Sequence, residues 1–178
     1  MSATGSTIGL LHPGEMGAAV GATLTGAGRR VLWASAGRSP ATAARADAAG
    51  LTDAGSIDAL CADSDVVLSI VPPHAALPLA REIAATGFSG VYVDANAVSP
   101  ATATEVAKAV REAGAAYVDG GIVGGPPGGK GSTRLYLSGE RADQVAGLCA
   151  GTALDAAVLG DDPTAASAMK MVFAAWTK

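Results

Sequence analysis

Three glycines near the amino terminus are spaced as in a turn that cradles phosphate groups. They are Gly9, Gly14 and Gly17 of the segment TIGLLHPGEMG, between a short apolar run and an Ala-rich stretch. A strand that leads through glycine-rich backbone into a helix presents free N–H groups and the positive end of the helix dipole to an anion. On this interpretation Gly9 permits the turn, Gly14 lets a pyrophosphate approach and Gly17 lets the helix pack on the strand. A purely structural turn is the alternative. The residues expected to contact a dinucleotide here are Gly9, Leu11, His12, Pro13, Gly14, Glu15, Met16 and Gly17.

The segment after the second apolar run, RRVLWA, bears on the choice of dinucleotide. A NAD-binding fold places an Asp or Glu there to accept a hydrogen bond from the ribose 2′-hydroxyl, and this chain continues with Ser-Ala-Gly-Arg-Ser instead. Arg38, with Ser35 and Ser39, can hold a 2′-phosphate by charge-assisted hydrogen bonds. The segment therefore predicts NADP in preference to NAD. In the alternative interpretation Arg38 is a solvated residue near a helix start.

Lys170, in the segment AMKMVFAAW, is the candidate proton carrier. Hydride transfer to or from a nicotinamide requires a second group that moves a proton, and a partly desolvated Lys can do so near neutral pH. Helical spacing gathers apolar neighbours into a stripe that can pack against protein, with Lys170 at its edge. The stripe consists of Met169, Val172, Phe173 and Trp176. An ordinary polar position on an amphipathic helix is the alternative.

The elements that must position these residues alternate between short β-branched runs and Ala-rich stretches, the pattern of βαβ units. We expect an α/β fold of the Rossmann type, with a doubly wound, mostly parallel sheet and helices on both faces. The expected strands are residues 7–11, 30–34, 66–71, 91–94, 116–119, 133–138 and 156–159. The expected helices are residues 15–27, 40–49, 57–61, 74–85, 100–113, 141–150 and 163–178. Ser39, Ser99 and Asp162 each precede a proline and are predicted helix N-caps, and the glycine-dense residues 120–132 are predicted to form a loop.

The carboxyl-terminal segment has neither a glycine cap nor a proline stop after Trp176. We therefore expect residues 1–160 to form a dinucleotide-binding domain and residues 161–178 to begin a long interdomain helix, with a further helical domain missing. Fraying of a terminal helix is the alternative.

Composition excludes several classes of partner. The 178 residues carry a formal net charge of −4 without a run of Lys or Arg, so we expect neither nucleic acid nor a membrane as a partner. Cys61 and Cys149 stand alone, which argues against a metal site or a disulfide framework. No leader-like or membrane-spanning apolar run is present, and the cytoplasm is the expected compartment.

Several segments, in order, resemble the β-hydroxyacid dehydrogenase superfamily, which includes 6-phosphogluconate dehydrogenase and 3-hydroxyisobutyrate dehydrogenase. GLLHPGEMG is similar to the family's opening GLGxMG, and VVLSIVPPHAA to its strand and loop beside the cofactor. DANAVSP is similar to D-x-[ST]-T-x-x-P, DGGIVGG to a substrate loop ending S-G-G, and AMKMVFAAW to the interdomain helix with a catalytic Lys. MKMVFAAWTK and DANAVSPAT look closest to a 6-phosphogluconate-dehydrogenase-like branch of NAD-binding proteins with a distinct C-terminal domain.

The resemblance implies roles for further residues. Lys170 would be the general acid/base, and Asn96 would orient the nicotinamide or the substrate, unless it is only an Asx cap for the helix that begins at Pro100. The loop residues implied to contact the cofactor are Val71, Pro72 and Pro73, and those implied to contact the substrate are Val123, Gly124 and Gly125.

Two positions depart from the family pattern. Val123 replaces a Ser, and Ala174 replaces an Asn one turn after the lysine, so the substrate pocket should be less polar and unable to hold a sugar phosphate in the usual way. We expect an NADP-dependent oxidoreductase that acts on a small hydroxy acid, ketone or imine-like substrate, and a homodimer when the C-terminal domain is present. A non-catalytic module that binds or senses a dinucleotide is the alternative.

Overall fold

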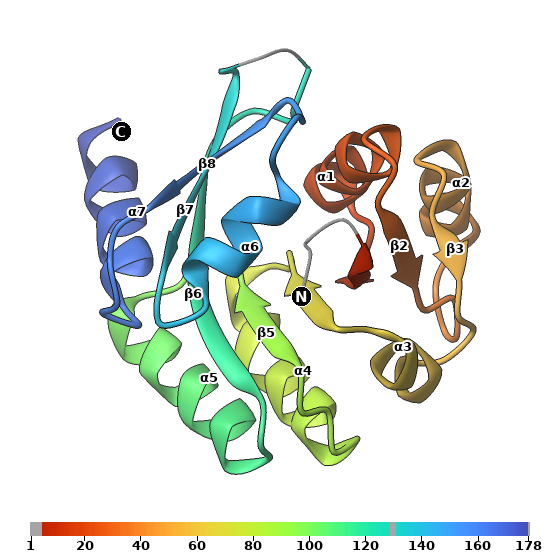
Figure 1. Cartoon of the computed structure of the whole chain (residues 1–178), viewed down its shortest axis with the longest axis horizontal. Helices are drawn as coiled ribbons and strands as arrows, with labels where there is room; N and C mark the ends of the chain where they lie inside the picture. Colours follow the sequence, from red (N-terminus) through yellow and green to blue (C-terminus); the bar gives the residue numbers. More distant parts are fainter. Residues whose placement is uncertain (1–4, 129–130, 178) are drawn as a thin grey trace.

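The computed structural model describes residues 5–128 and 131–177, and its centre is an eight-stranded sheet in the order β3-β2-β1-β4-β5-β6-β7-β8 (Figure 1). Neighbouring strands are parallel except β6 and β7, which are antiparallel. The strands are β1 (Thr7–Leu11), β2 (Arg30–Trp33), β3 (Thr52–Asp53), β4 (Val66–Ser69), β5 (Val91–Asp94), β6 (Ala116–Gly124), β7 (Thr133–Ser138) and β8 (Leu154–Val158). The order reverses between β1 and β4, which is the switch point where open α/β sheets bind ligands.

Helices cover both faces of the sheet, so the predicted doubly wound Rossmann fold is confirmed. Side chains alternate along each strand: Val91 and Val93 of β5 enter one core, whereas Tyr92 enters the other. The first core contains residues of α1 (Glu15–Gly26), α2 (Pro40–Ala48) and α6 (Ala142–Leu148). The second contains residues of α3 (Ile57–Asp63), α4 (Pro73–Ala85) and α5 (Pro100–Glu112). The last helix, α7 (Ala165–Trp176), lies against β6 and beside α5 (Figure 1).

Two of the three predicted helix N-caps are confirmed. The hydroxyls of Ser39 and Ser99 accept hydrogen bonds from the N–H groups of Thr42 and Thr102. Asp162 was predicted to cap a helix that starts at Pro163, and this is wrong. Its carboxylate instead accepts both the N–H and the hydroxyl of Thr164, which turns the chain before α7 begins at Ala165.

The glycine-dense segment also differs from the prediction, because regular structure continues through residue 124. β6 reaches Gly124 and pairs with β7 from Asp119↔Ser138 to Gly124↔Thr133. Crowding favours glycine at position 121, because a Cβ there would stand 3.0 Å from the carbonyl oxygen of Ala166, closer than most side chains pack. Of the predicted loop, residues 125–128 and 131–132 connect β6 to β7, and residues 129–130 lie outside the described residues.

Smaller differences occur at other elements. The two-residue strand β3 was not predicted, because Thr52–Asp53 carries no alternating apolar pattern. β8 begins at Leu154, two residues before the expected start. Among the described helices, none has both the length and the apolar character that crossing a bilayer demands.

Candidate functional site

The turn after β1 is built around His12. In the described part of the chain, His12 is the one non-glycine residue with a left-handed backbone, and its φ is 61°. The N–H of Gly14 donates to the carbonyl oxygen of His12 at 2.7 Å, which closes a tight turn around the buried Pro13. His12, Gly14 and Gly17 thus have the spacing of G-x-G-x-x-G, with His12 at the first position, where the fingerprint uses glycine for the tight turn.

The role predicted for Gly9 is therefore wrong. Gly9 lies inside β1 and pairs with both β2 and β4. A Cβ at this position would collide with the side chain of Leu60, and it would stand 2.6 Å from the hydroxyl oxygen of Ser64. Because Gly9 has no side chain, α3 can pack on the strand. The spacing of glycines in the sequence does not distinguish a glycine needed for such packing from a glycine needed for a turn.

Gly14 and Gly17 serve different purposes. A Cβ on Gly17 would stand 2.8 Å from the carbonyl oxygen of His12, so this glycine lets the first turn of α1 approach the turn before it. A Cβ on Gly14 would meet nothing nearer than that same oxygen at 4.0 Å. Because the protein's own atoms do not require glycine at position 14, the open space there fits a ligand that approaches the backbone closely. Glu15 is exposed at the start of α1, and Met16 packs against the first core.

Two guanidinium groups lie near the turn. Arg38 interacts electrostatically with His12, and burial followed by this positive charge lowers the pKa of His12 to about 4, so its imidazole is neutral at pH 7. Nε of Arg45 donates to the carbonyl oxygen of Pro13 at 3.2 Å, and Nη2 donates to the hydroxyl of Thr42 at 3.2 Å. Arg45 was not among the predicted site residues. The helix start at Pro40 placed positions 42 and 45 on one face, but the sequence did not indicate what that face meets.

The predicted 2′-phosphate residues border an acidic side chain from another strand. Ser35 follows β2, and both its hydroxyl and its N–H bind the carboxylate of Asp53, which also accepts the N–H of Gly55 at 2.7 Å. These hydrogen bonds lower the pKa of Asp53. Sequence reasoning found no carboxylate directly after β2 and missed Asp53, because β3 carries it to this position. Ser39 is exposed beside Arg38 and caps α2.

Asn96 links the loops that follow β4 and β5. Its Oδ1 accepts the N–H of Val71 at 2.6 Å, and its Nδ2 donates to Ser69 Oγ at 3.0 Å and to Asp94 Oδ1 at 2.5 Å. The residue is 2% exposed. This network gives Asn96 a positioning role, because both N–H groups of its amide have protein partners. Its predicted contact with nicotinamide or substrate stays a prediction. The Asx-cap alternative is wrong, since Ser99 caps α5. Pro72 and Pro73 are exposed just beyond Val71, where α4 starts.

The predicted substrate residues lie where β6 turns toward β7. Val123 is half-buried, and Gly124 has a φ of 108°; a Cβ there would collide with the carbonyl oxygen of Ser132. The carbonyl oxygen of Gly125 accepts the hydroxyl of Thr133 at 2.5 Å. Backbone geometry thus accounts for glycine at position 124.

Lys170 lies next to these residues. Its Nζ donates to the carbonyl oxygen of Ile122 at 2.6 Å, and its side chain is partly buried. Gly121 makes this approach possible, because a Cβ there would stand 3.1 Å from the Cβ of Lys170. The structure therefore brings Lys170 to the carboxyl end of β6, beside Val123.

The predicted apolar stripe of α7 does not pack on the sheet. Val172, Phe173 and Trp176 are 70%, 41% and 89% exposed. The buried positions of α7 are Ala166 and Ser167, whose spacing from Lys170 places all three on the side that meets β6. Small side chains permit this close contact, whereas Val172, Phe173 and Trp176 of the stripe lie on the exposed side of α7.

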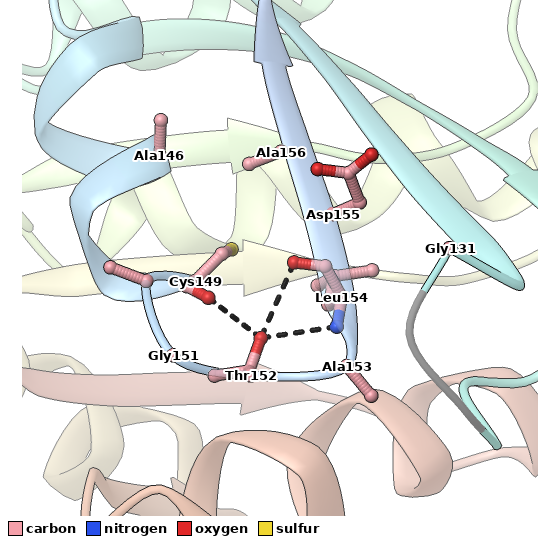
Figure 2. A pocket seen from close by; sticks show the side chains of 10 residues that line it. Gly131, Ala146, Cys149, Gly151, Thr152, Ala153, Leu154, Asp155 and Ala156 are labelled. Carbon is pink, nitrogen blue, oxygen red and sulfur yellow. Dashed lines mark hydrogen bonds between the residues drawn. The ribbon is translucent and has the colours of Figure 1, made fainter.

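A separate hollow of about 590 Å³ lies between the end of α6 and the start of β8 (Figure 2). Two polar side chains of its lining have partners within the protein. The hydroxyl of Thr152 binds Cys149 O, Leu154 O and Leu154 N, and Asp155 pairs with Arg134 at 2.6 Å. Burial raises the pKa of the Cys149 thiol to about 11, which keeps it protonated. None of the predicted site residues lines this hollow. Within residues 5–128 and 131–177, His, Cys, Asp and Glu side chains form no cluster suited to a metal ion.

The fold and the turn after β1 define a dinucleotide-binding α/β domain. The family model described as the NAD binding domain of 6-phosphogluconate dehydrogenase matches residues 7–146, and the chain belongs to this family. The predicted superfamily is thereby confirmed. The chain is thus an NAD-binding domain of the 6-phosphogluconate dehydrogenase type.

Individual proteins agree with this assignment. The chain is 31% identical over 119 residues to an uncharacterized 28.5 kDa protein in the 7S RNA 5′ region of Methanothermus fervidus, a match that covers 67% of this chain and 45% of the relative. A conserved protein of unknown function, described as structurally similar to 3-hydroxyacid dehydrogenases, superposes with a TM-score of 0.85 at 31% identity. The match covers 96% of this chain and 64% of that protein's chain. A reductive aminase from Aspergillus terreus in complex with NADPH4, cyclohexanone and allyl amine shares the fold, with a TM-score of 0.81 at 23% identity over 97% of this chain and 61% of its own. The chain thus spans less than two thirds of the length of each of these proteins.

Proposed function

We propose that the chain binds NADP(H), with the pyrophosphate over Gly14 and the start of α1 and the 2′-phosphate beside Arg38. The space above Gly14 and the positive charges of Arg38 and Arg45 support this placement. The backbone N–H groups at a helix start and a guanidinium are the donors that phosphate groups favour. Val71, Pro72 and Pro73 then border the nicotinamide half at the carboxyl end of β4.

We further propose that the whole protein is an oxidoreductase in which Lys170 moves the proton. When bound, the nicotinamide cofactor supplies or accepts the hydride. In the reducing direction Lys170 donates a proton from its ammonium group to the carbonyl oxygen or imine nitrogen, and it regains a proton from solvent. The observation that carries this proposal is the 2.6 Å hydrogen bond from Nζ to Ile122, which holds the amine at the carboxyl end of β6 with its other N–H groups available to a substrate.

The substrate class follows from the surroundings of Lys170. Val123 offers no hydrogen bond at the position where related loops have a Ser, and Ala174 offers none one turn further along α7. A site without these donors favours a small ketone, imine-like compound or hydroxy acid over a sugar phosphate.

The division of the chain is also a proposal. Residues 1–160 would form the dinucleotide-binding unit, and residues 161–178 would begin a helix that connects to a second domain. The exposed apolar residues of α7 support this division. A homodimer would then be assembled through that domain.

The experiment compares Lys170→Met with Lys108→Met in the full-length protein, following NADPH oxidation with panels of small ketones, ketone–amine mixtures and keto acids. Lys108 is an exposed lysine of α5 and serves as the matched control. Lys170→Met should retain NADPH affinity and lose turnover by roughly 100- to 10,000-fold, the usual contribution of a positioned acid/base. Full turnover in Lys170→Met would refute the catalytic role. Tight NADPH binding without turnover of any panel member would favour a non-catalytic dinucleotide-binding module.

A further inference from the structure

The helix that carries Lys170 begins without a cap of its own. Thr164 precedes α7, but its side chain makes no capping hydrogen bond. The first N–H groups of a helix have no partner within the helix and need one from elsewhere. The second and third helical residues, Ala166 and Ser167, are both fully buried, so water does not satisfy their N–H groups.

Two strands of the sheet supply the missing acceptors. The N–H of Ala166 donates to Ser138 Oγ at 3.1 Å, and the N–H of Ser167 donates to Asp119 Oδ2 at 2.7 Å. The hydroxyl of Ser167 adds a bond to Asp119 Oδ1 at 2.5 Å. Asp119 and Ser138 face each other as partners across β6 and β7, and both are fully buried. One cross-strand pair therefore caps α7 in place of a local N-cap residue.

This cap fixes the position of Lys170. Lys170 follows Ser167 by three residues, so it lies above the capped turn on the same side of α7. β6 contributes three successive contacts to that side: Asp119 binds Ser167, Gly121 accommodates Ala166 and the lysine stem, and Ile122 accepts the bond from Nζ. A carboxyl group at the helix start also has favourable electrostatics with the helix dipole.

We propose that Asp119, acting with Ser138, is a positioning residue for Lys170, which it holds through the first turn of α7 at the carboxyl end of β6. The significance of this role for catalysis rests on the proposed function of Lys170. The position of Lys170 can be measured without a substrate and independently of turnover. It also explains a buried carboxyl group that contacts neither the turn after β1 nor the loops after β4 and β5.

The test measures the accessibility of the lysine amines in the protein by brief acetylation with acetic anhydride and mass spectrometry, with Lys108 of the same molecule as the internal reference. In Asp119→Ala the rate for Lys170 relative to Lys108 should rise by roughly tenfold, because one hydrogen bond to a charged group changes an opening equilibrium by about that factor. Amide hydrogen exchange at residues 166–169 should accelerate with it. Asp119→Asn should restore most of the protection, since its amide retains an acceptor for the N–H of Ser167.

The matched control is Asp94→Asn. Asp94 is the register partner of Asp119 on β5 and is equally buried, but its carboxylate accepts hydrogen bonds from the N–H and the side-chain amide of Asn96. The control should leave the Lys170 rate unchanged. If Asp119→Ala does not fold, Ser138→Ala and Gly121→Ala perturb the same contact from neighbouring positions and should expose Lys170 as well.

Unchanged acetylation of Lys170 in folded Asp119→Ala would overturn the proposal, as would an equal increase in Asp94→Asn. Failure of Asp119→Asn to restore protection would also overturn it, because hydrogen bonding would then not explain the effect. Full turnover in Lys170→Met would refute the proposed function and would leave the acetylation result unaffected. The two failures are therefore distinguishable.

Discussion

The carbonyl oxygen of His12 lies 2.8 Å from the point at which a Cβ on residue 17 would stand. The turn after β1 and the first turn of α1 are thus in direct backbone contact. This contact holds the start of α1 beside the open space over Gly14, where we propose the pyrophosphate. The geometry of the site therefore depends on the lack of a side chain at Gly17.

Gly17→Ala should lower both stability and NADPH affinity. The added methyl group forces the turn away from α1, and overpacking of this kind costs about 1–3 kcal/mol. Gly26→Ala is the control in the same helix, because a Cβ there meets nothing within 4 Å; it should be neutral or stabilising. Urea unfolding and calorimetric titration with NADPH measure the two effects. Equal behaviour of the two variants would contradict the role of Gly17.

His12 should titrate far below an ordinary histidine. Its pKa is lowered from 6.5 to about 4, first by burial and then by Arg38. The unfolded chain therefore binds more protons between these two values, and stability is lost as pH falls from about 6.5 to about 4. The protein has two histidines, so proton NMR can follow His12 against His74. Arg38→Ala should raise the pKa of His12, whereas a titration of His12 near 6.5 in the parent protein would refute this environment.

Replacing His12 by Asn tests the same effect on stability. Asn tolerates the left-handed backbone but does not titrate, so the variant should lose less stability than the parent between pH 6.5 and pH 4. His12→Val should be the least stable of the three, since a β-branched side chain at this φ costs on the order of 1–3 kcal/mol. Urea unfolding at both pH values measures this, and parallel pH profiles would count against it.

The order of elements was accessible from the sequence because it depends on local patterns. Runs such as VVLS and VYVD are apolar on both faces, as strands buried in a parallel sheet must be, and Ser39 and Ser99 marked helix starts by their position before proline. The antiparallel pairing of residues 120–124 was not accessible, because each glycine there meets a segment distant in the sequence or a backbone turn: Gly121 lies against α7, and Gly124 lies against the carbonyl oxygen of Ser132. The reversal of direction at β7 likewise depends on pairing between distant segments.

The candidate site was accessible only in part. Lys170, Arg38 and the turn glycines have recognisable types and spacings. Asp53 and Arg45 reach the site from β3 and α2, and only the folded chain shows which side they face. Gly9 shows the opposite limitation: its residue type was informative, but packing against Leu60 determines its purpose.

Asp94 should make the protein less stable as pH rises toward neutrality. Burial raises the pKa of Asp94 to about 7, and the nearby Asp119 adds to this increase, although hydrogen bonds from Asn96 oppose it in part. Asp94 Oδ2 has no hydrogen-bond partner. The folded state then binds more protons than the unfolded state between about pH 4 and pH 7, so stability falls across this window by up to about 4 kcal/mol. In Asp94→Asn this loss should largely disappear. Urea unfolding at pH 4.5 and pH 7.5 measures it, and an equal change in parent and variant would rule it out.

The final prediction concerns the choice between NADPH and NADH, on which Arg38 and Asp53 have opposite effects. A guanidinium attracts a 2′-phosphate, whereas the carboxylate of Asp53, bound to Ser35, repels it and can accept a hydrogen bond from a free 2′-hydroxyl. We expect the parent to bind NADPH at least roughly tenfold more tightly than NADH, since one charge-assisted contact contributes about 1.5–3 kcal/mol. Arg38→Ala should abolish that preference, and Asp53→Asn should strengthen it while retaining an acceptor for the N–H of Gly55. Arg30→Ala is the control, because Arg30 begins β2 at the opposite end from Arg38 and should leave the ratio unchanged. Calorimetric titration of all four proteins with both cofactors provides the ratios. Equal affinities in the parent would refute NADP selection, and an unchanged ratio in Arg38→Ala would show that selection occurs at another residue.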